Sequence, residues 1–267
     1  MQASLPMYYP PREAVTAFWA ALATLLRAEA ACAQFDIPNE LRWPEDVHAH
    51  WLESDLLLSQ ACGYPFVTLL EGRVQLVGTF AYAAAGTQGI HCRSQLICRA
   101  EDSRQSLADF AGSNVAFNDT ISQSGYNALR ALVAGISAPR PFFGKALQTG
   151  AHYRSIEAVR TGAADMAAID PVSWAHWQRS NPALSAQLRV FAQTQPYPGL
   201  PLISAMQTPP TVMAALRKSL HTLAHVADYA DLRKPLLITG FEVTERPDYQ
   251  VCLTMQEMAF SQDVREL

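Results

Sequence analysis

Two hydroxyls and a carboxamide stand together where a short apolar strand, residues 115–117, runs into a polar loop. The loop brings Ser122, Gln123 and Ser124 to a helix that we expect to begin near Gly125. A helix N-terminus carries unpaired backbone N–H groups and a partial positive charge. Hydroxyl and amide donors beside those groups suit a small oxyanion such as phosphate, phosphonate or carboxylate. The alternative is an ordinary serine N-cap without a ligand.

Four more side chains could line a binding site. Tyr8 lies on the turn after the first predicted strand and Tyr82 on a connector of small residues. Aromatic walls that carry a phenol suit a small organic ligand. Ser59 and Gln60 end a buried strand, where their side chains can present hydrogen-bond donors. The alternatives are packing of the two tyrosines between lobes, and a plain turn at Ser59 and Gln60.

The composition excludes several classes of function. The 267 residues are 49% hydrophobic, which is enough for a large core or two lobes. Only 16% are charged and the net charge is -4, which is unlike the basic surface of a nucleic-acid binder. No cysteine or histidine pair has zinc spacing, and no P-loop, H-E-x-x-H or G-x-S-x-G motif is present. We therefore expect no metal and no cofactor.

The five cysteines and the N-terminus bear on the cellular compartment. We expect buried reduced thiols, with a disulfide between Cys62 and Cys92 as the alternative. The first residues lack a basic and an apolar region, so they are not a signal peptide. The most apolar stretch, residues 14–33, is interrupted by polar side chains and is not a membrane span. The chain is therefore periplasmic if a signal peptide is removed from a precursor, and cytoplasmic otherwise.

Strands and helices alternate along the chain, which predicts an α/β protein with mostly parallel sheets flanked by helices. Two connectors, residues 81–89 and 194–201, are rich in small residues or proline and bracket the middle of the chain. We expect two lobes joined by two crossing strands. Lobe 1 combines residues 1–83 with 194–267, and lobe 2 is residues 84–193. A ligand would lie in the cleft between them.

Four stretches, in order, resemble one known family: residues 5–8, 55–65, 118–126 and 150–170. The third matches the pattern D-x-x-S-x-S-G-Y. The family is that of type 2 periplasmic-binding-protein folds, and more narrowly the substrate-binding components of phosphate and phosphonate ABC importers. The resemblance covers most of the chain. It implies two α/β lobes, joined by two hinge strands, that close over the ligand.

The resemblance also implies roles for individual residues. In the family, the hydroxyls and N–H groups of the S-x-S-G turn hold phosphonate oxygens, which here implies Ser122 and Ser124. Gln123 departs from the pattern, because a hydroxyl residue is common at that position in phosphonate binders. His152 matches a family histidine that faces the ligand. The departure at Gln123 leaves open which oxyanion binds.

Physical arguments from the residues leave alternatives open for two of the candidates. A histidine near an anion can donate from either ring nitrogen, but His152 could instead bond to backbone at a helix start. Asp170 follows a predicted strand, at the sheet edge where ligand clefts form, and could pair with an amine or hydroxyl of the ligand. It could equally cap the helix that begins at Pro171.

These observations predict a solute-binding protein. It would capture a small oxyanion of phosphonate, phosphate or phosphite type in the cleft and deliver it to the permease of an ABC-type importer. We expect neither nucleic-acid binding nor direct membrane insertion. One alternative is a cytoplasmic enzyme on the same fold, similar to the menaquinone-pathway enzymes that dehydrate chorismate. Another is a ligand-sensing module that uses the same closure.

Overall fold

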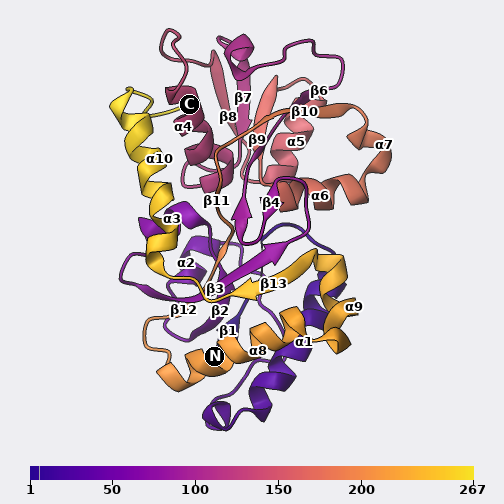
Figure 1. The fold of residues 1–267 in the computed structure, drawn as a ribbon, viewed down its shortest axis with the longest axis vertical. Coiled ribbons are helices and arrows are strands. Elements are labelled where there is room, and N and C mark those ends of the chain that lie inside the picture. Colours follow the sequence, from indigo (N-terminus) through magenta and orange to yellow (C-terminus); the bar gives the residue numbers. More distant parts are fainter. Residues whose placement is uncertain (6) are drawn as a thin grey trace. The chain divides into compact units, whose positions relative to one another are not determined.

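The computed structural model describes residues 1–5 and 7–267 and divides the chain into two compact units (Figure 1). Unit 1 contains Met1–Ala83, Gln88–His91 and Pro198–Asp248. Unit 2 contains Ala84–Thr87, Cys92–Tyr197 and Tyr249–Leu267. Pro6, within the first stretch that resembles the family, lies outside the described residues.

The sheet of unit 1 has five strands in the order β1-β2-β12-β3-β13. Strands β1 and β2 are parallel, whereas the three later pairings are antiparallel. The prediction of mostly parallel sheets is wrong for this unit. Strand β12 enters after the second connector between β2 and β3 and runs against both, and the helix Pro210–His225 then carries the chain to β13 on the far side of β3. The strands are β1 (Gln2–Ala3), β2 (Leu56–Gln60), β3 (Val74–Tyr82), β12 (Pro201–Ala205) and β13 (Ile238–Glu242).

Helix α1 (Arg12–Ala28) shows why the helices of unit 1 pack as they do. Its buried side chains include Val15, Phe18, Leu22 and Leu26, at the three-to-four-residue spacing of one helix face. The long helix α8 (Pro210–His225) lies along α1 (Figure 1). The other helices are α2 (Val47–Trp51), α3 (Gly63–Val67), α9 (Ala230–Arg233) and the 3₁₀ turns Ala30–Cys32, Ala227–Tyr229, Lys234–Leu236 and Arg246–Tyr249.

The sheet of unit 2 has the order β10-β6-β9-β7-β8. Strands β9, β7 and β8 are parallel, and β6 is antiparallel to both β9 and β10. The carboxyl ends of β7 and β9 therefore lie side by side, which brings together the loops that follow them. The strands are β6 (Gln95–Arg99), β7 (Asn114–Phe117), β8 (Lys145–Gln148), β9 (Met166–Ile169) and β10 (Leu188–Gln193).

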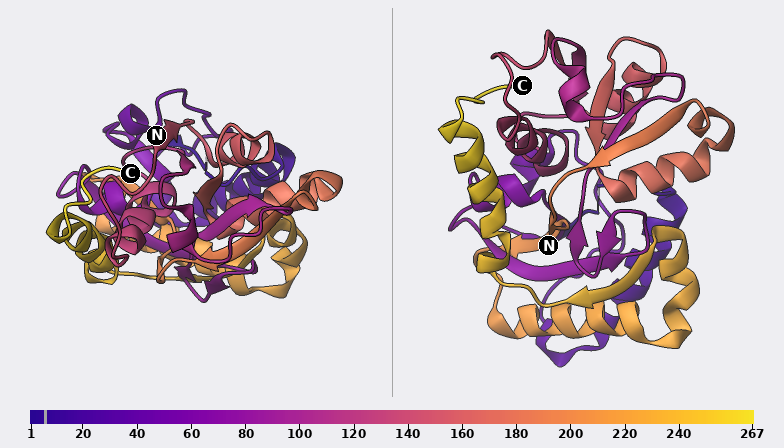
Figure 2. Two further views of the ribbon diagram at one scale, coloured as in Figure 1. Left: turned by 90° about the horizontal axis from the view of Figure 1, so that it is seen from above. Right: turned by 45° about the horizontal axis from the view of Figure 1, so that its top comes forward.

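The helices of unit 2 include the C-terminal helix α10 (Gln250–Ser261), which packs against α4 (Ala128–Ala134), as Figures 1 and 2 show. The side chain of Asn127 donates to the Cys252 carbonyl at 2.8 Å and so ties these helices together. The sequence predicted this segment in lobe 1, whereas its contacts group it with unit 2. The remaining helices are α5 (His152–Arg160), α6 (Pro171–Ser180), α7 (Pro182–Ser185), the 3₁₀ turn η2 (Leu107–Phe110) and the π-helix η3 (Gln123–Asn127).

Three two-residue strands lie where the chain passes between the units and form a small sheet in the order β11-β5-β4. They are β4 (Thr87–Gln88), β5 (His91–Cys92) and β11 (Tyr197–Pro198). All five cysteines are buried thiols, as expected, and Cys62 and Cys92 are not joined by a disulfide. Over residues 1–5 and 7–267, no helix has the length and apolar character needed to cross a membrane.

Candidate functional site

The polar loop after β7 ends at Ser122, which caps η3. The Oγ atom of Ser122 accepts a hydrogen bond from the N–H of Gly125 at 3.1 Å. The N–H of Asn127 reaches back to the Ser122 carbonyl at 2.9 Å, so this first turn is wider than an α-helix. Wide single turns of this kind are frequent at functional sites. The helix therefore begins at Gln123, two residues earlier than predicted, and Ser122 does serve as an N-cap.

Ser122, Ser124 and His152 form one polar group, which we call the serine–histidine cluster. The Oγ atoms of Ser122 and Ser124 are 3.5 Å apart. The Oγ of Ser124 is 2.8 Å from the Nε2 of His152, the first residue of α5. Both serines are buried. The structure thus brings together the three residues that the resemblance implied for oxyanion binding.

His152 is electrically neutral in this setting. The residue is partly buried, and its Nδ1 atom is inaccessible to solvent and has no hydrogen-bond partner among the described residues. Loss of hydration lowers the pKa of the imidazole from 6.5 to about 4. Burying an unpaired, unprotonated Nδ1 costs less free energy than burying an unpaired N–H group. We therefore place the imidazole proton on Nε2. Nε2–H then donates to Ser124, which leaves the Ser124 hydroxyl proton for another acceptor.

Gly125 allows the loop to close tightly on this cluster. A Cβ atom at position 125 would collide with the Oδ1 atom of Asn118 and lie 3.2 Å from the Cε1 atom of His152. Asn118 Oδ1 is also buried without a hydrogen-bond partner among the described residues. Two unsatisfied polar atoms therefore flank the start of η3, and such groups call for a ligand or a water.

Asp170 lies directly after β9, on the strand next to β7. Its Oδ1 atom accepts from the N–H groups of Val172 and Ser173 at 2.8 and 3.0 Å, so the predicted N-cap of α6 is present. Burial raises the pKa of the carboxyl to about 7, although these two N–H groups act in the opposite direction. In the described part of the chain, no basic side chain forms an ion pair with it. A substantial fraction of Asp170 is therefore protonated near neutral pH.

The side chain of Gln123 is engaged away from the two serines. Its Nε2 atom is 3.1 Å from the sulfur of Met255 on α10, and its Oε1 atom accepts from the Asn127 amide at 2.9 Å. These contacts use the carboxamide to hold α10 against η3. If Gln123 contacts a ligand at this site, we expect the contact to involve its backbone.

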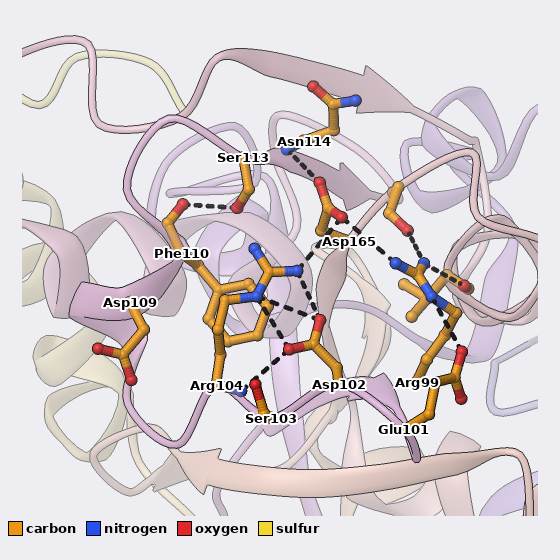
Figure 3. A network of polar contacts seen from close by, with 12 residues as sticks. Arg99, Glu101, Asp102, Ser103, Arg104, Asp109, Phe110, Ser113, Asn114 and Asp165 are labelled. Atoms are coloured by element: carbon orange, nitrogen blue, oxygen red, sulfur yellow. Dashed lines mark hydrogen bonds and ion pairs between the residues drawn. The ribbon is translucent and has the colours of Figure 1, made fainter.

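The opposite end of the same sheet carries a network of ion pairs (Figure 3). Asp165, the residue before β9, accepts from the N–H of Asn114 at 2.8 Å and lies 3.4 Å from Arg99 and 3.3 Å from Arg104. Burial alone would raise the pKa of Asp165, but these donors outweigh it and lower the pKa. Arg104 also pairs with Asp102 and lowers the pKa of that carboxyl to about 2. Asp102 and Asp165 thus each have an arginine partner.

In unit 1, three of the predicted residues form a second group, which we call the tyrosine cluster. The rings of Tyr8 and Tyr82 meet edge to face with centroids 5.1 Å apart. The Nε2 atom of Gln60 donates to the Tyr82 hydroxyl at 3.2 Å. Tyr8 and Tyr9 both have positive φ angles, 72° and 59°, which side-chain-bearing residues adopt at an energetic cost and often at functional sites.

Ser59 points into a buried relay. Its Oγ atom is 2.9 Å from the Oγ of Ser4, which is 2.8 Å from Nε2 of His50, and Nδ1 of His50 is 3.0 Å from Glu53. Because a carboxylate only accepts, Nδ1 of His50 donates to Glu53. The Ser59 hydroxyl is thus engaged by Ser4 inside unit 1.

Two residues at the serine–histidine cluster were not selected from the sequence. Asn118 lies in the polar loop, one residue after β7, and its place at a strand end was the available signal. Ser94 donates from Oγ to the carbonyl of Ser124 at 2.8 Å. No local pattern marks Ser94, because its partner lies 30 residues later in the chain.

Comparisons with known proteins identify the family and the fold. Residues 11–249 match the family model described as ABC transporter, phosphonate, periplasmic substrate-binding protein. No curated protein matches the chain significantly.

Three solved structures share the fold. The binding-protein component of a phosphonate ABC transporter from Pseudomonas aeruginosa has a TM-score of 0.75 and 15% identity, covering 98% of this chain and 87% of that one. PhnD1 from Prochlorococcus marinus, in complex with methylphosphonate, has a TM-score of 0.72 and 14% identity, covering 96% of both chains. A Xanthomonas citri protein bound to chloride ion has a TM-score of 0.68 and 16% identity, covering 98% and 97%.

Proposed function

We propose that this chain, which belongs to the family of phosphonate periplasmic substrate-binding proteins of ABC transporters, captures a small tetrahedral oxyanion at Ser122, Ser124 and the start of η3. The ligand class is phosphonate, phosphate or phosphite. The role is binding and delivery, and the partner is the permease of an ABC-type importer. The periplasm is the compartment that this role requires.

The observation that carries the proposal is the direction of the hydrogen bonds in the serine–histidine cluster. The Ser122 Oγ accepts from Gly125, and the Ser124 Oγ accepts from a neutral His152. A ligand oxygen that replaces the long 3.5 Å contact between the two Oγ atoms therefore finds both hydroxyl protons available. Both hydroxyls lie at a helix N-terminus, where the helix dipole favours negative charge. Neutral donors in fixed positions can hold an anion without a formal ion pair.

Two further contacts belong to the proposal. Protonated Asp170 would donate a hydrogen bond to an anion, whereas ionised Asp170 would pair with an amine on the ligand. Tyr8, Tyr82 and Gln60 offer an aromatic surface with polar edges, which suits an organic substituent. A simple alkylphosphonate and an aminoalkylphosphonate distinguish the two protonation states of Asp170, because only the amine gains from the ionised form.

The experiment is a thermal-unfolding series with phosphate, phosphite, methylphosphonate, an aminoalkylphosphonate and acetate. A ligand that binds only the folded state raises its stability by about 2.7 kcal/mol at 100 times its Kd. We expect at least one phosphorus oxyanion to raise the Tm clearly more than acetate does.

Ser122→Ala combined with Ser124→Ala is the matched variant. We expect it to lose that shift, and loss of the Ser122 cap should lower its ligand-free stability by about 1 kcal/mol. Ser185→Ala, at a half-buried serine of α7 that donates to the Pro182 carbonyl, is the control. A panel that leaves the wild-type Tm unchanged contradicts the ligand class. A double variant that keeps the shift shows that the two serines only cap the helix.

A further inference from the structure

The serine–histidine cluster is connected to the segments that carry the chain between the units. These connector segments are residues 84–94 and 194–198, which contain the crossing strands β4, β5 and β11. Ser94 ends the first segment, and Tyr197 lies in the second. Neither residue belongs to the oxyanion site proposed above.

Ser94 and Tyr197 form a relay with a defined direction. A carbonyl oxygen only accepts, so Ser94 Oγ must donate to the Ser124 carbonyl, at 2.8 Å. The Tyr197 hydroxyl lies 2.6 Å from the same Oγ atom, and it must donate because the Ser94 proton is already in use. Ser94 is completely buried and Tyr197 nearly so. A broken link would therefore leave a buried polar group unsatisfied.

The two connector segments are also bonded to each other at this point. The N–H of Ser94 donates to the Thr194 Oγ1 atom at 2.9 Å, and the N–H of Thr194 donates to the Ser94 carbonyl at 3.1 Å. The guanidinium of Arg93 donates to the Thr194 carbonyl at 3.0 Å. The segments therefore meet as one bonded unit where they reach the Ser124 peptide.

The ring of Tyr197 adds a second, apolar link. It packs in a buried group with Ala128 and Ala131 of α4 and with Met255 of α10. The sulfur of Met255 is the contact of the Gln123 side chain. Tyr197 is thus linked to η3 in two ways: its hydroxyl through Ser94, and its ring through α4 and α10.

We propose that Ser94 and Tyr197 are positioning residues that couple the oxyanion loop to the connector segments. They fix the Ser124 peptide without touching the ligand, and occupancy of the loop is transmitted through them to residues 84–94 and 194–198. Because coupling between two sites is reciprocal, a change in either residue alters both ligand affinity and the response of the connectors. This inference rests on the proposed oxyanion site.

The first test measures methylphosphonate affinity by calorimetry in Ser94→Ala, Tyr197→Phe and the double variant. Loss of one buried hydrogen bond predicts a fall of about tenfold for Ser94→Ala and a smaller fall for Tyr197→Phe. Because Tyr197 OH acts through Ser94, the double variant should bind no more weakly than Ser94→Ala. Ser113→Ala is the control, since Ser113 also donates to a carbonyl, that of Phe110 at 2.5 Å, at the other end of the sheet.

The second readout is amide hydrogen exchange with and without methylphosphonate. In the wild type, the ligand should slow exchange in the loop over 122–128 and in both connector segments. In Ser94→Ala, at saturating methylphosphonate, only the loop should respond. A connector response in Ser94→Ala equal to that of the wild type overturns the coupling, as do affinity losses that multiply in the double variant.

A ligand-free measurement keeps this inference separate from the proposed function. Tyr197→Phe should speed exchange of the Gly125 and Asn127 amides, which bond to Ser122, whereas Tyr153→Phe on α5 should not. If the wild type binds no oxyanion, the proposed function fails. The ligand-free exchange measurement still shows whether Ser94 and Tyr197 position the loop. Unchanged exchange at both amides in Tyr197→Phe contradicts the relay.

Discussion

Strand β9 carries an aspartate at each end, and the two carboxyls have opposite surroundings. Asp165, before the strand, is bonded to Arg99, Arg104 and the Asn114 N–H, and its pKa is lowered (Figure 3). Asp170, after the strand, caps a helix without a basic partner among the described residues, and burial raises its pKa to about 7. The four residues of β9 separate the two aspartates.

The comparison extends from the two aspartates to the two ends of the sheet. At the amino end of β9 the described charges are paired with one another. At the carboxyl end, His152 Nδ1 and Asn118 Oδ1 are buried without a described partner, and the hydroxyls of Ser122 and Ser124 meet only at a long distance of 3.5 Å. Burial of unsatisfied polar groups costs free energy, so a protein retains them where something else satisfies them. Under the proposed function, one end of the sheet serves stability and the other holds the ligand.

The largest expected effect is at the paired end. Asp165→Ala leaves Arg99 and Arg104 short of a partner and the Asn114 N–H without an acceptor. We expect a loss of about 3 kcal/mol of unfolding free energy at pH 7, with unchanged oxyanion affinity. Urea unfolding and calorimetry measure the two quantities. A variant that keeps its stability but loses affinity would reverse the roles of the two ends.

Asp170→Asn should instead raise the unfolding free energy. The folded-state pKa is raised above the unfolded value of 3.8, so the stability linked to this proton is complete below pH 3.8 and lost as the pH rises through about 7. At pH 8 the wild type buries an unpaired carboxylate, whereas asparagine is neutral and still caps a helix. We expect a gain of about 2 kcal/mol at pH 8 that shrinks toward pH 4. Urea unfolding at pH 8 and at pH 4 measures this difference in unfolding free energy. A variant less stable than the wild type at pH 8 would contradict the claim that Asp170 is buried without a balancing charge.

Two glycines sharpen the same contrast. A Cβ atom on Gly144 would collide with the carbonyl of Gly112, which is backbone and cannot move aside. A Cβ on Gly125 would collide with the Asn118 side chain, which can move aside. We expect Gly144→Ala to lose about 2 kcal/mol of stability, and Gly125→Ala to lose less stability but most of its affinity. Thermal unfolding and calorimetry on both variants give the comparison, and equal affinities for both would count against the loop as the site.

The smallest expected effect concerns His152. Its folded-state pKa of about 4 lies below the unfolded 6.5, so the unfolded chain binds the proton first. This group therefore lowers stability as the pH falls from about 6.5 toward 4. In an Asp170→Asn background, which removes the opposing trend, His152→Gln should reduce that acid-induced loss by about 1 kcal/mol, a value kept low because the residue is partly exposed. Identical pH profiles with and without His152 would show that its burial has no such cost.

Much of the fold was predictable from local patterns. The apolar face of α1 has helical spacing, and residues 115–117 fall within β7. The family membership and its solute-binding role followed from ordered motifs, above all the loop that ends at Ser122 and Ser124. Only the family resemblance predicted that His152 lies with these serines, because the histidine is 28 positions after Ser124 in the chain.

Long-range contacts explain what the sequence did not show. Gln123 was a predicted ligand residue, but its carboxamide meets Met255 on a helix 132 residues later. Each antiparallel pairing in the two five-stranded sheets involves a strand next to a connector, β3, β6, β10 or β12, and hydrophobic runs do not reveal such pairings. Asn118 and Ser94 gain their importance only from partners brought near by folding. The set Tyr8, Tyr82, Ser59, Gln60, His152 and Asp170 stays a prediction as ligand contacts.

The most direct measurement is calorimetric titration of methylphosphonate into the wild type, into Ser122→Ala combined with Ser124→Ala, and into Asp165→Ala. The carboxyl-end site predicts saturable binding to the wild type, a loss of at least about 100-fold in the serine double variant, and wild-type affinity in Asp165→Ala. Equal affinity in the wild type and the serine double variant would contradict the assignment of the oxyanion site to the start of η3.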